Sequence, residues 1–506
     1  MNKMRIMSLS LAAILLASVF VPCFVAVPTA AQLDPIKIGI FAPFTGAGLS
    51  FYAPWTQQGF ELGMIYATTE MGYDNENKTE AGRPYELYYY DTMGLPTTAA
   101  TLATSAIETD GIDILVGGTY SSVAAAIAPI AEDYEKLFFI SPAADASLTA
   151  SNFNPYLFRI ARNNWQDAYA GVTYAMDTLN HSRFAFLAAD YSFGRSGVES
   201  MSRVIEEKGG TVVGIQYAGL FTSVWDSYMT SLISYDQFLG GIDYLFVIWA
   251  GSFASMYAAF GTFNIGSYME IAGACIDIKS MNEIEAGMTP PASYVNATGL
   301  CLYGYDLPNN TVNDWMVAQH EARNIRPDAD VVLQPGMRPE VNTFRAPELF
   351  TASAFATAQF LVDVTNAIPN LDTDLMINYL ESGITIDCPK GPTYLRPDDH
   401  QGLAEMYIAK AVNDTRPGSE TENLIIAELV ETLDRNAVAP PIESVWNGEP
   451  YTPGGFAPPT TTPTTTTPTT TTEPPPPPQI EPMLLLALGG GAVVVIILIA
   501  VFARKK

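Results

Sequence analysis

Histidine and cysteine are scarce in this chain of 506 residues, which contains three of the first and four of the second. So few cysteines cannot build a disulfide scaffold, and their spacing matches no metal-binding motif. The histidines His181, His320 and His400 are each isolated in the sequence. The sequence also contains no Gly-rich phosphate loop, no nucleophile elbow and no metal-ligand helix motif. We therefore expect no enzyme, no metal site and no cofactor.

Basic residues are also few. The chain has 25 Lys and Arg against 53 Asp and Glu, which gives a formal net charge of −28. Because nucleic acids are bound through basic surfaces, we expect no nucleic-acid partner. A strongly acidic exterior favours solubility and says little about the fold.

The N-terminus has the pattern of an export signal over residues 1–31. Lys3 and Arg5 precede the apolar stretch Met7 to Val21, and Thr29-Ala30-Ala31 offers a small-residue cleavage site. The residues Val21-Pro22 before Cys23 match the lipoprotein signal poorly, so we do not expect lipidation. The sequence therefore predicts an exported chain.

The C-terminus predicts a membrane anchor. Residues 483–503 carry no charge and, at about 1.5 Å per residue, would span about 31 Å as a helix, the thickness of a bilayer core. Arg504, Lys505 and Lys506 follow at once, and positive residues stay on the cytoplasmic side. We expect a single transmembrane helix with everything before it outside the cell.

A stalk precedes this anchor at residues 458–479, which are nearly all Thr and Pro and cannot bury a core. Such tracts are typical of O-glycosylated spacers. The remaining 425 or so residues are enough for two lobes.

The folded part contains three cysteines, which can form at most one disulfide, and the sequence leaves the pairing open: Cys275, Cys301 and Cys388. Five sequons fit an exported glycoprotein: Asn77, Asn180, Asn296, Asn309 and Asn413.

Short apolar runs alternate with helical patterns in the folded part. Strands are predicted at 36–41, 85–90, 112–116 and 137–140, with helices from about 56, at 97–109 and at 123–134 between them. The pattern starts again with strands at 184–188, 211–216, 244–249 and 269–274, and helices at 197–208, 227–234 and 254–260. Two such α/β units predict two doubly wound lobes with parallel sheets. Ligands bind at the carboxyl ends of such strands, so we expect a site between the lobes.

Several stretches then follow one another in a recognisable order. They are IKIGIFAPFTG at 36–46, YYDT at 89–92, DGIDILVGGTYSS at 110–122, IAPIAEDY at 127–134, FFISPAADASLT at 138–149, NPYLFRIAR at 154–162, DYSFGRSG at 190–197 and PTYLRPDDHQG at 392–402. From Ile36 to about Ala411, the chain resembles the type I periplasmic-binding fold, and most closely the branched-chain amino acid (Leu/Ile/Val) binding proteins of ABC importers. The stretch around His400, which suggests metal chemistry in isolation, is a turn in that family.

The resemblance implies two lobes joined by three crossings, near 159–162, 301–305 and 388–393. Lobe 1 would comprise residues 35–160 and 303–388, and lobe 2 residues 161–302 and 389–445. It also implies a small-molecule ligand held between the lobes and an ABC permease as the membrane partner.

Ligand contacts are expected first at Tyr120-Ser121-Ser122, between a buried strand and a helix. Backbone N–H groups and the positive end of the helix dipole meet there. The resemblance assigns Ser121 to the carboxylate of an amino acid; a plain helix cap is the alternative. Ala143 matches a residue of the family whose backbone carbonyl accepts a hydrogen bond from the ammonium group of the ligand. Asp145 replaces the family threonine, and we leave open whether it contacts the ammonium, selects a cationic or neutral ligand, or turns to solvent.

Aromatic residues are expected to close the site. The candidates are Phe51 and Tyr52 after the first strand, Phe193 in place of a family tyrosine, and Trp249 at a strand end, where a core role is equally possible. Asp277 is the candidate partner of a ligand ammonium. Arg162 and Arg195 are possible ligand contacts too, although solvated hinge or surface charges are the favoured interpretation.

The sequence therefore predicts a cell-surface binding protein of an ABC importer, in a C-terminally anchored form that looks archaeal, with an amino acid or similar small polar solute as its ligand. The alternative is a ligand-sensing ectodomain that works through a partner membrane protein, although only three residues follow the predicted span. A third hypothesis is a surface enzyme or adhesin that kept the fold and lost the clamp.

Overall fold

The computed structural model describes residues 33–46, 52–73, 75–251, 253–272, 297–323, 347–417 and 425–454. The predicted export signal, stalk and anchor lie outside these residues, as do Phe51, Cys275, Asp277 and Asn296. In the part of the chain that is described, no helix is long and apolar enough to cross a membrane.

An eight-stranded sheet forms the centre of the first lobe, in the order β11-β12-β13-β5-β4-β3-β1-β2. Strands β1 to β5 are parallel, while β12 runs antiparallel to both of its neighbours. The strands are β1 (Ile36–Ala42), β2 (Tyr85–Asp91), β3 (Ile114–Gly117), β4 (Phe138–Ile140), β5 (Leu157–Arg159), β11 (Thr385–Cys388), β12 (Gly391–Arg396) and β13 (Gln401–Leu403).

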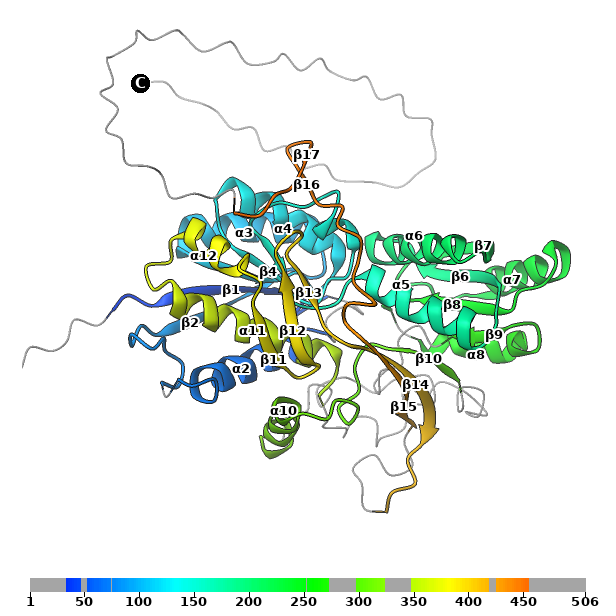
Figure 1. Cartoon of the computed structure of the whole chain (residues 1–506). Helices are drawn as coiled ribbons and strands as arrows, with labels where there is room; N and C mark the ends of the chain where they lie inside the picture. Colours follow the sequence, from blue (N-terminus) through cyan, green and yellow to red (C-terminus); the bar gives the residue numbers. More distant parts are fainter. Residues whose placement is uncertain are drawn as a thin grey trace, which may run out of the picture. The chain divides into compact units, whose positions relative to one another are not determined.

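Helices cover both faces of this sheet (Figure 1). On one face lie α2 (Ala53–Thr69), α11 (Leu349–Ala367) and α12 (Thr373–Leu380), and on the other α3 (Pro96–Ser105) and α4 (Ser121–Asp133). Neighbouring residues of β1 show the division, because Ile40 packs toward α2 and Phe41 toward α3 and α4. Strands buried on both faces read as continuous apolar runs, which is why the sequence revealed them.

Helices α2 and α11 pack at unusually close range. A Cβ atom on Gly59 would lie 2.3 Å from the carbonyl oxygen of Thr351, and one on Gly63 would lie 2.5 Å from that of Phe355. Real Cβ atoms do not approach so closely, so glycine is required at both positions. This packing fixes the start of α11, whose first residues reach the site described below.

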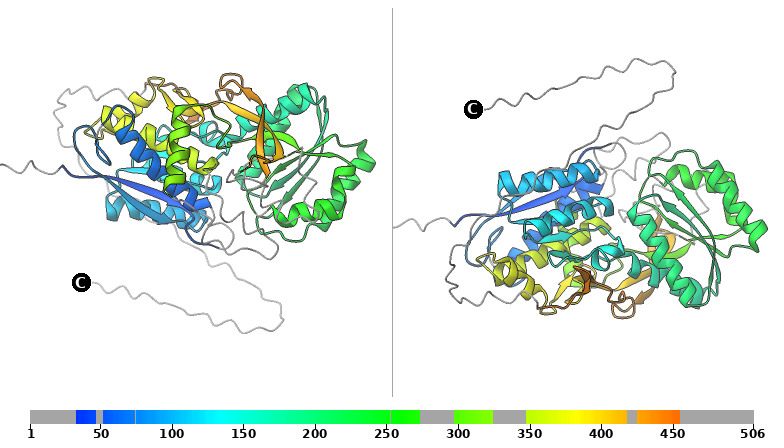
Figure 2. Two further views of the ribbon diagram at one scale, coloured as in Figure 1. Left: turned by 90° about the horizontal axis from the view of Figure 1, so that it is seen from below. Right: turned by 90° about the horizontal axis from the view of Figure 1, so that it is seen from above.

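The second lobe has a parallel four-stranded sheet in the order β7-β6-β8-β9. The strands are β6 (Arg183–Ala189), β7 (Thr211–Ala218), β8 (Tyr244–Ile248) and β9 (Glu270–Ala272). Helices α5 (Asn164–Thr173) and α6 (Ser192–Glu207) cover one face, and α7 (Asp226–Leu239) and α8 (Ala254–Thr262) cover the other (Figure 2). All four strands lie within about three residues of the predicted ranges.

A smaller antiparallel sheet, β10-β14-β15, lies where the chain passes between the lobes. It consists of β10 (Thr298–Cys301), β14 (Met406–Asn413) and β15 (Ile425–Leu433), and helix α10 (Thr311–Ala322) follows β10. Leu300 and Ile408 of this sheet share a buried cluster with Leu62 of α2 and Ala170 of α5. The region between the lobes therefore has a core of its own.

The expected third crossing near 388–393 is wrong. Residues 389–403 were assigned to lobe 2, but β12 and β13 belong to the eight-stranded sheet of lobe 1. The reason is a hairpin: Cys388 pairs with Gly391, and Gly391 takes a φ of +94° that suits glycine, so the chain turns back within the same sheet. The chain leaves this sheet after Leu403 instead.

The last described residues return to lobe 1. The short hairpin β16 (Val445–Trp446) and β17 (Glu449–Pro450) leads to Tyr451, whose hydroxyl donates to Glu381. His400 lies in the turn between β12 and β13, with Nδ1 2.8 Å from the carbonyl oxygen of Leu157 and Nε2 2.8 Å from Oε1 of Glu381. These contacts hold the C-terminal segment to the fold.

Of the cysteines within the described ranges, Cys301 and Cys388 are both buried and form no disulfide with each other. Burial raises the pKa of the Cys388 thiol to about 12, so this thiol stays protonated.

Candidate functional site

A cavity lies between residues of the two lobes, with about 560 Å³ of space that includes its open mouth. Lobe 1 contributes residues that follow β3 and β4 and begin α2, α4 and α11, while lobe 2 contributes the start of α6 and the loop after β8. The lining comprises Tyr52, Thr119, Tyr120, Ser121, Pro142, Ala143, Ala144, Arg162, Tyr191, Phe193, Trp249, Ala250, Phe253, Leu302, Leu349 and Phe350.

The N-terminus of α4 forms one wall of this cavity. Tyr120 is the N-cap, and no side chain caps the helix there. The first N–H groups of α4 and the positive end of its dipole therefore belong to this wall. Thr119 is 7 % exposed, and within the described residues its Oγ1 is buried without a hydrogen-bond partner. A buried hydroxyl costs free energy unless a partner satisfies it. The wall can therefore hold an anionic group such as a carboxylate.

Ser121 does not cap α4, contrary to the plain alternative considered from the sequence. It is the first residue of the helix, and its Oγ accepts a hydrogen bond from the backbone N–H of Asp145 at 3.2 Å. A serine hydroxyl that accepts one hydrogen bond can still donate its own proton. Burial raises the pKa of the neighbouring Tyr120 far above its ordinary value, so this phenol is also a neutral donor.

Asp145 is turned away from the cavity. Its Oδ1 accepts from the backbone N–H of Ser147 at 3.0 Å and from the Ser147 hydroxyl at 2.8 Å, which caps the 3-10 helix Ala146–Thr149. The side chain is neither solvent-exposed nor among the lining residues. Of the three roles left open for Asp145, the turn to solvent is therefore wrong, and the two roles toward a ligand stay predictions.

Carbonyl groups of the same loop are held by two buried arginines. Arg159 Nη1 donates to the carbonyl oxygens of Asp145 at 2.6 Å and Ala143 at 3.3 Å, and Arg162 Nη1 donates to that of Pro142 at 3.0 Å. Burial lowers the pKa of Arg159 to about 10, against the raising effect of the Asp145 and Asp399 charges, so it remains a cation at neutral pH. The loop that was expected to accept from a ligand ammonium thus already faces guanidinium groups.

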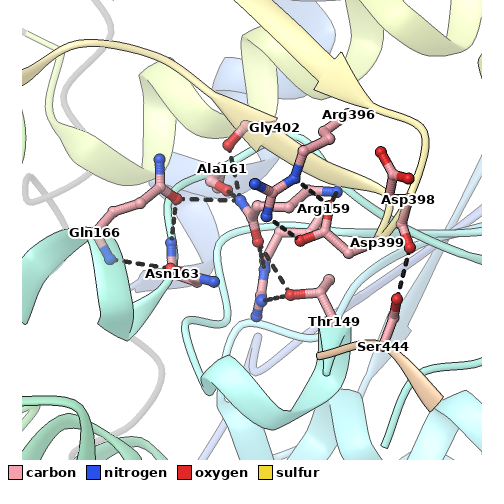
Figure 3. Close-up of polar contacts among 11 residues, drawn as sticks. Thr149, Arg159, Ala161, Asn163, Gln166, Arg396, Asp398, Asp399, Gly402 and Ser444 are labelled. Atoms are coloured by element: carbon pink, nitrogen blue, oxygen red, sulfur yellow. Dashed lines mark hydrogen bonds and ion pairs between the residues drawn. The ribbon is translucent and has the colours of Figure 1, made fainter. Parts of the chain in front are cut away.

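A polar network connects this loop to the first crossing between the lobes (Figure 3). Gln401 accepts from Arg159 Nε at 2.8 Å, and its amide nitrogen donates to the carbonyl oxygen of Ala161 at 2.7 Å and to Gln166 at 3.2 Å. Gln166 in turn forms a capping box with Asn163 at the start of α5. Loop, crossing and the first helix of lobe 2 are therefore linked through buried side chains.

Aromatic rings provide most of the remaining wall. Tyr52 stacks on Phe350 with ring centroids 4.1 Å apart, and its hydroxyl donates to the carbonyl oxygen of Ala250 at 3.2 Å, which links lobe 1 to lobe 2. The rings of Tyr120 and Tyr191 also meet across the lobes, at 6.1 Å. A Cβ atom on Gly194 would lie 2.0 Å from the carbonyl oxygen of Ala189, so the close approach of α6 to β6 requires this glycine.

The structure brings together six of the ten residues predicted from the sequence: Tyr52, Tyr120, Ser121, Ala143, Phe193 and Trp249. Trp249 combines both roles considered for it, because it lines the cavity and also meets Trp225 in the core at 5.1 Å. Ser122 and Asp145 are not among the lining residues. Phe51 and Asp277 lie outside the described residues.

Other contributors were ranked low or missed in the sequence. Arg162 was named as a possible ligand contact but interpreted preferentially as a solvated hinge or surface charge; it is 9 % exposed, lines the cavity and lies 3.5 Å from Asp167. Leu349 and Phe350 begin α11, more than 200 residues after Ser121 in the α4 wall, and no local pattern connects them to it. Arg195 is exposed, as expected, and pairs with Asp190.

Comparison with known proteins agrees with this architecture. A family model described as periplasmic binding protein matches residues 35–416. Among solved structures, an ABC-type branched-chain amino acid transporter from Rhodopseudomonas palustris CGA009 is similar, with a TM-score of 0.61 and 25% identity over 81% of this chain and 100% of that one.

Two other solved structures share the fold. One is an amino acid ABC transporter substrate-binding protein from Pseudomonas fluorescens Pf-5, with a TM-score of 0.65 and 17% identity over 82% of this chain and 100% of that one. The other is a solute-binding protein of an ABC transporter from Rhodopseudomonas palustris BisB5 in complex with 3,4-dihydroxybenzoic acid, with a TM-score of 0.64 and 16% identity over 79% of this chain and 98% of that one. No curated protein matches the chain.

Proposed function

The chain belongs to the periplasmic binding protein family, and from that premise we propose that it is the solute-binding component of an ABC importer. It captures an amino acid or a similar small solute that carries a carboxylate, and it delivers this solute to a permease in the membrane. The predicted signal, stalk and C-terminal helix would keep it at the cell surface.

The observation that carries this proposal is the cavity lined from both lobes. A solute in this position contacts both sheets at once and therefore stabilises the closed arrangement over an open one. The carboxylate would lie at the start of α4, where Thr119 and Ser121 supply hydroxyl groups and the helix supplies its N-terminal N–H groups. The aromatic rings would enclose the apolar body of the solute.

Relatives support this range of ligands without selecting one. Similar solved structures include proteins described as amino acid transporters and one in complex with 3,4-dihydroxybenzoic acid. These ligands share a carboxylate and differ in the rest of the molecule. The common element of the proposal is therefore the carboxylate end.

A ligand screen on Ser121→Ala tests the proposal. The purified full-length chain is screened by thermal shift against amino acids and aromatic acids, because a ligand that binds only the folded state raises the melting temperature. For the ligand that binds best, Ser121→Ala should weaken binding by about 1–2 kcal/mol, the cost of losing a hydrogen bond to a charged group.

Ser147→Ala is the matched control, since this serine contacts Asp145 but lines no part of the cavity. It should leave the affinity within about twofold. An unchanged affinity in Ser121→Ala would remove the start of α4 from the site, and a screen without any stabilising carboxylate would contradict the proposed ligand class.

A further inference from the structure

A second cavity lies beside the first one. It has about 410 Å³ of space, and Arg162 and Leu349 line both cavities, so these two side chains form a shared wall. Its other lining residues come from α11, from the first crossing and from the β11–β12 hairpin, including Lys390. We refer to the first cavity as the outer one and to the second as the inner one.

Every formally charged residue that lines the two cavities is a cation. Arg162 lines both, and Lys390 lines the inner one. Two nearby acids already accept hydrogen bonds from the backbone. Asp145 accepts from the N–H of Ser147, and Glu348 Oε1 accepts from the N–H of Phe350 at 2.8 Å at the start of α11. The described lining thus contains no carboxylate for an ammonium group.

Lys390 is half-buried and has few partners for its charge. In the described structure, its ammonium lies 3.5 Å from the sulfur of Met406 and 5.3 Å from the ring centroid of Tyr407, which are both weak partners. Desolvation and the positive charge of Arg162 together lower the pKa of Lys390 to about 8, against the smaller raising effects of Asp167, Cys301 and Glu405. Asp167, the buried carboxylate beside Arg162, is therefore shared between two cations.

We infer that the solute of this chain carries two acidic groups, the first held at the start of α4 and the second facing Arg162 and Lys390. The inference rests on the proposed function and specifies its ligand. An oxyanion near Arg162 would gain a charge-assisted hydrogen bond from the guanidinium and would offset the desolvation cost of the half-buried Lys390 ammonium. A zwitterionic amino acid would place its ammonium among cations instead.

The net charge of −28 makes this arrangement informative. The chain as a whole repels anions, so no general attraction would bring a dianion to it. Binding of such a ligand would have to come from local cations, and the inference assigns it to Arg162 and Lys390.

Titration calorimetry on the full-length chain with three probes tests this inference. The probes are benzoate, benzene-1,4-dicarboxylate and phenylalanine, which present one acid, two acids, and an acid with an ammonium. We expect the dicarboxylate to bind at least about tenfold more tightly than benzoate, since it adds a charged hydrogen bond. Lys390→Met should reduce dicarboxylate affinity severalfold and leave benzoate within about twofold.

Lys410→Met is the matched control, because Lys410 of β14 lines neither cavity and its loss changes the net charge equally. It should change neither affinity by more than about twofold. Retained benzoate binding in Lys390→Met shows that the variant is folded.

Proton uptake gives a second readout that a structural defect would not imitate. Near pH 8 about half of the Lys390 ammonium groups have lost a proton in the free chain, and a bound anion raises this pKa, so dicarboxylate binding should take up protons. Calorimetry in buffers of different ionisation enthalpy measures the uptake, which should vanish in Lys390→Met.

The outcomes separate this inference from the proposed function. If benzoate and the dicarboxylate bind equally, or if Lys390→Met weakens both alike, the second acidic group is refuted while the carboxylate site at α4 stands. If phenylalanine binds best, the inference is also refuted. If none of the probes binds and Ser121→Ala changes no ligand found by screening, the proposed function fails as well.

Discussion

At the scale of single residues, the buried pair Glu381 and His400 decides how the C-terminal segment is held. Glu381 Oε1 accepts from His400, and its Oε2 accepts from the backbone N–H of Gly454 at 2.6 Å. Burial raises the pKa of Glu381, but the hydrogen bonds from His400 and Tyr451 outweigh it, so the net pKa is lowered.

Glu381→Gln should therefore destabilise the chain in a pH-dependent way. A carboxyl group whose pKa is lower in the folded state stabilises the fold above its unfolded pKa of about 4.5, and this contribution is lost as the pH falls through the folded pKa. We expect a loss of about 1–3 kcal/mol at pH 7, with a smaller difference from wild type below pH 4. Thermal unfolding of both proteins across this range measures it.

Glu431→Gln, at an exposed position of β15, is the control and should have little effect. A stability difference for Glu381→Gln that is the same at pH 7 and pH 3.5 would contradict the role of the charge.

At the same scale, the hydroxyls and rings near the cavity were easier to predict than its cations. Tyr120, Ser121 and Phe193 stand next to recognisable strand ends or turns, but the family resemblance, and not the local pattern alone, identified them as site residues. Arg162 was interpreted preferentially as a hinge or surface charge because arginine is usually exposed. Its burial depends on Pro142 and Asp167, contacts that only the folded chain creates.

At the scale of elements, the contact between α2 and α11 depends on the absence of side chains. Gly63→Ala would place a methyl group 2.5 Å from the Phe355 carbonyl and 2.8 Å from the Ala358 Cβ, so the helices would have to separate. We expect a loss of about 1–3 kcal/mol, typical of overpacking, measured as a lower midpoint of thermal unfolding.

Gly261→Ala in α8 is the matched control for this prediction. This glycine is exposed, and a Cβ atom added to it would have no neighbour within 4 Å, so alanine should stabilise the helix by up to about 1 kcal/mol. A Gly63→Ala protein as stable as Gly261→Ala would show that α2 and α11 can relax at no cost.

Helix starts were harder to predict than helix faces. Phe60, Met64 and Ala67 line the buried face of α2, as their spacing predicted. Helix α6, in contrast, begins at Ser192 rather than at the predicted Gly197. Its first turn carries Phe193 and Gly194, which are set by the cavity and by the close contact with Ala189 rather than by apolar periodicity.

At the scale of the whole molecule, the alternation of strands and helices predicted both parallel sheets but not how the chain divides between them. Strands β1 to β4 and β6 to β9 follow one another along the chain with helices between them, and most of the strand residues are apolar. Strands β12 and β13 were missed as parts of lobe 1, because an antiparallel return within one sheet has no signature that separates it from a crossing between lobes. The packing of helix α11 was also difficult to predict, since its partner α2 lies nearly 300 residues earlier in the sequence.

In the proposed function, binding depends on closure of the two lobes, and the hydrogen bond from Tyr52 to the carbonyl of Ala250 joins residues of both lobes. Tyr52→Phe keeps the ring that stacks on Phe350 but removes this donor. We expect ligand affinity to fall by about 1 kcal/mol, roughly fivefold, because the open arrangement gains relative to the closed one. The melting temperature without ligand should stay close to that of wild type.

Tyr88→Phe is the control for this prediction. It removes a hydroxyl that donates to Glu86 away from the cavity, and it should bind ligand as wild type does. In solution scattering, saturating ligand should reduce the radius of gyration of both variants. An affinity in Tyr52→Phe equal to wild type would show that this contact does not contribute to closure, and a radius of gyration that ligand leaves unchanged would contradict closure itself.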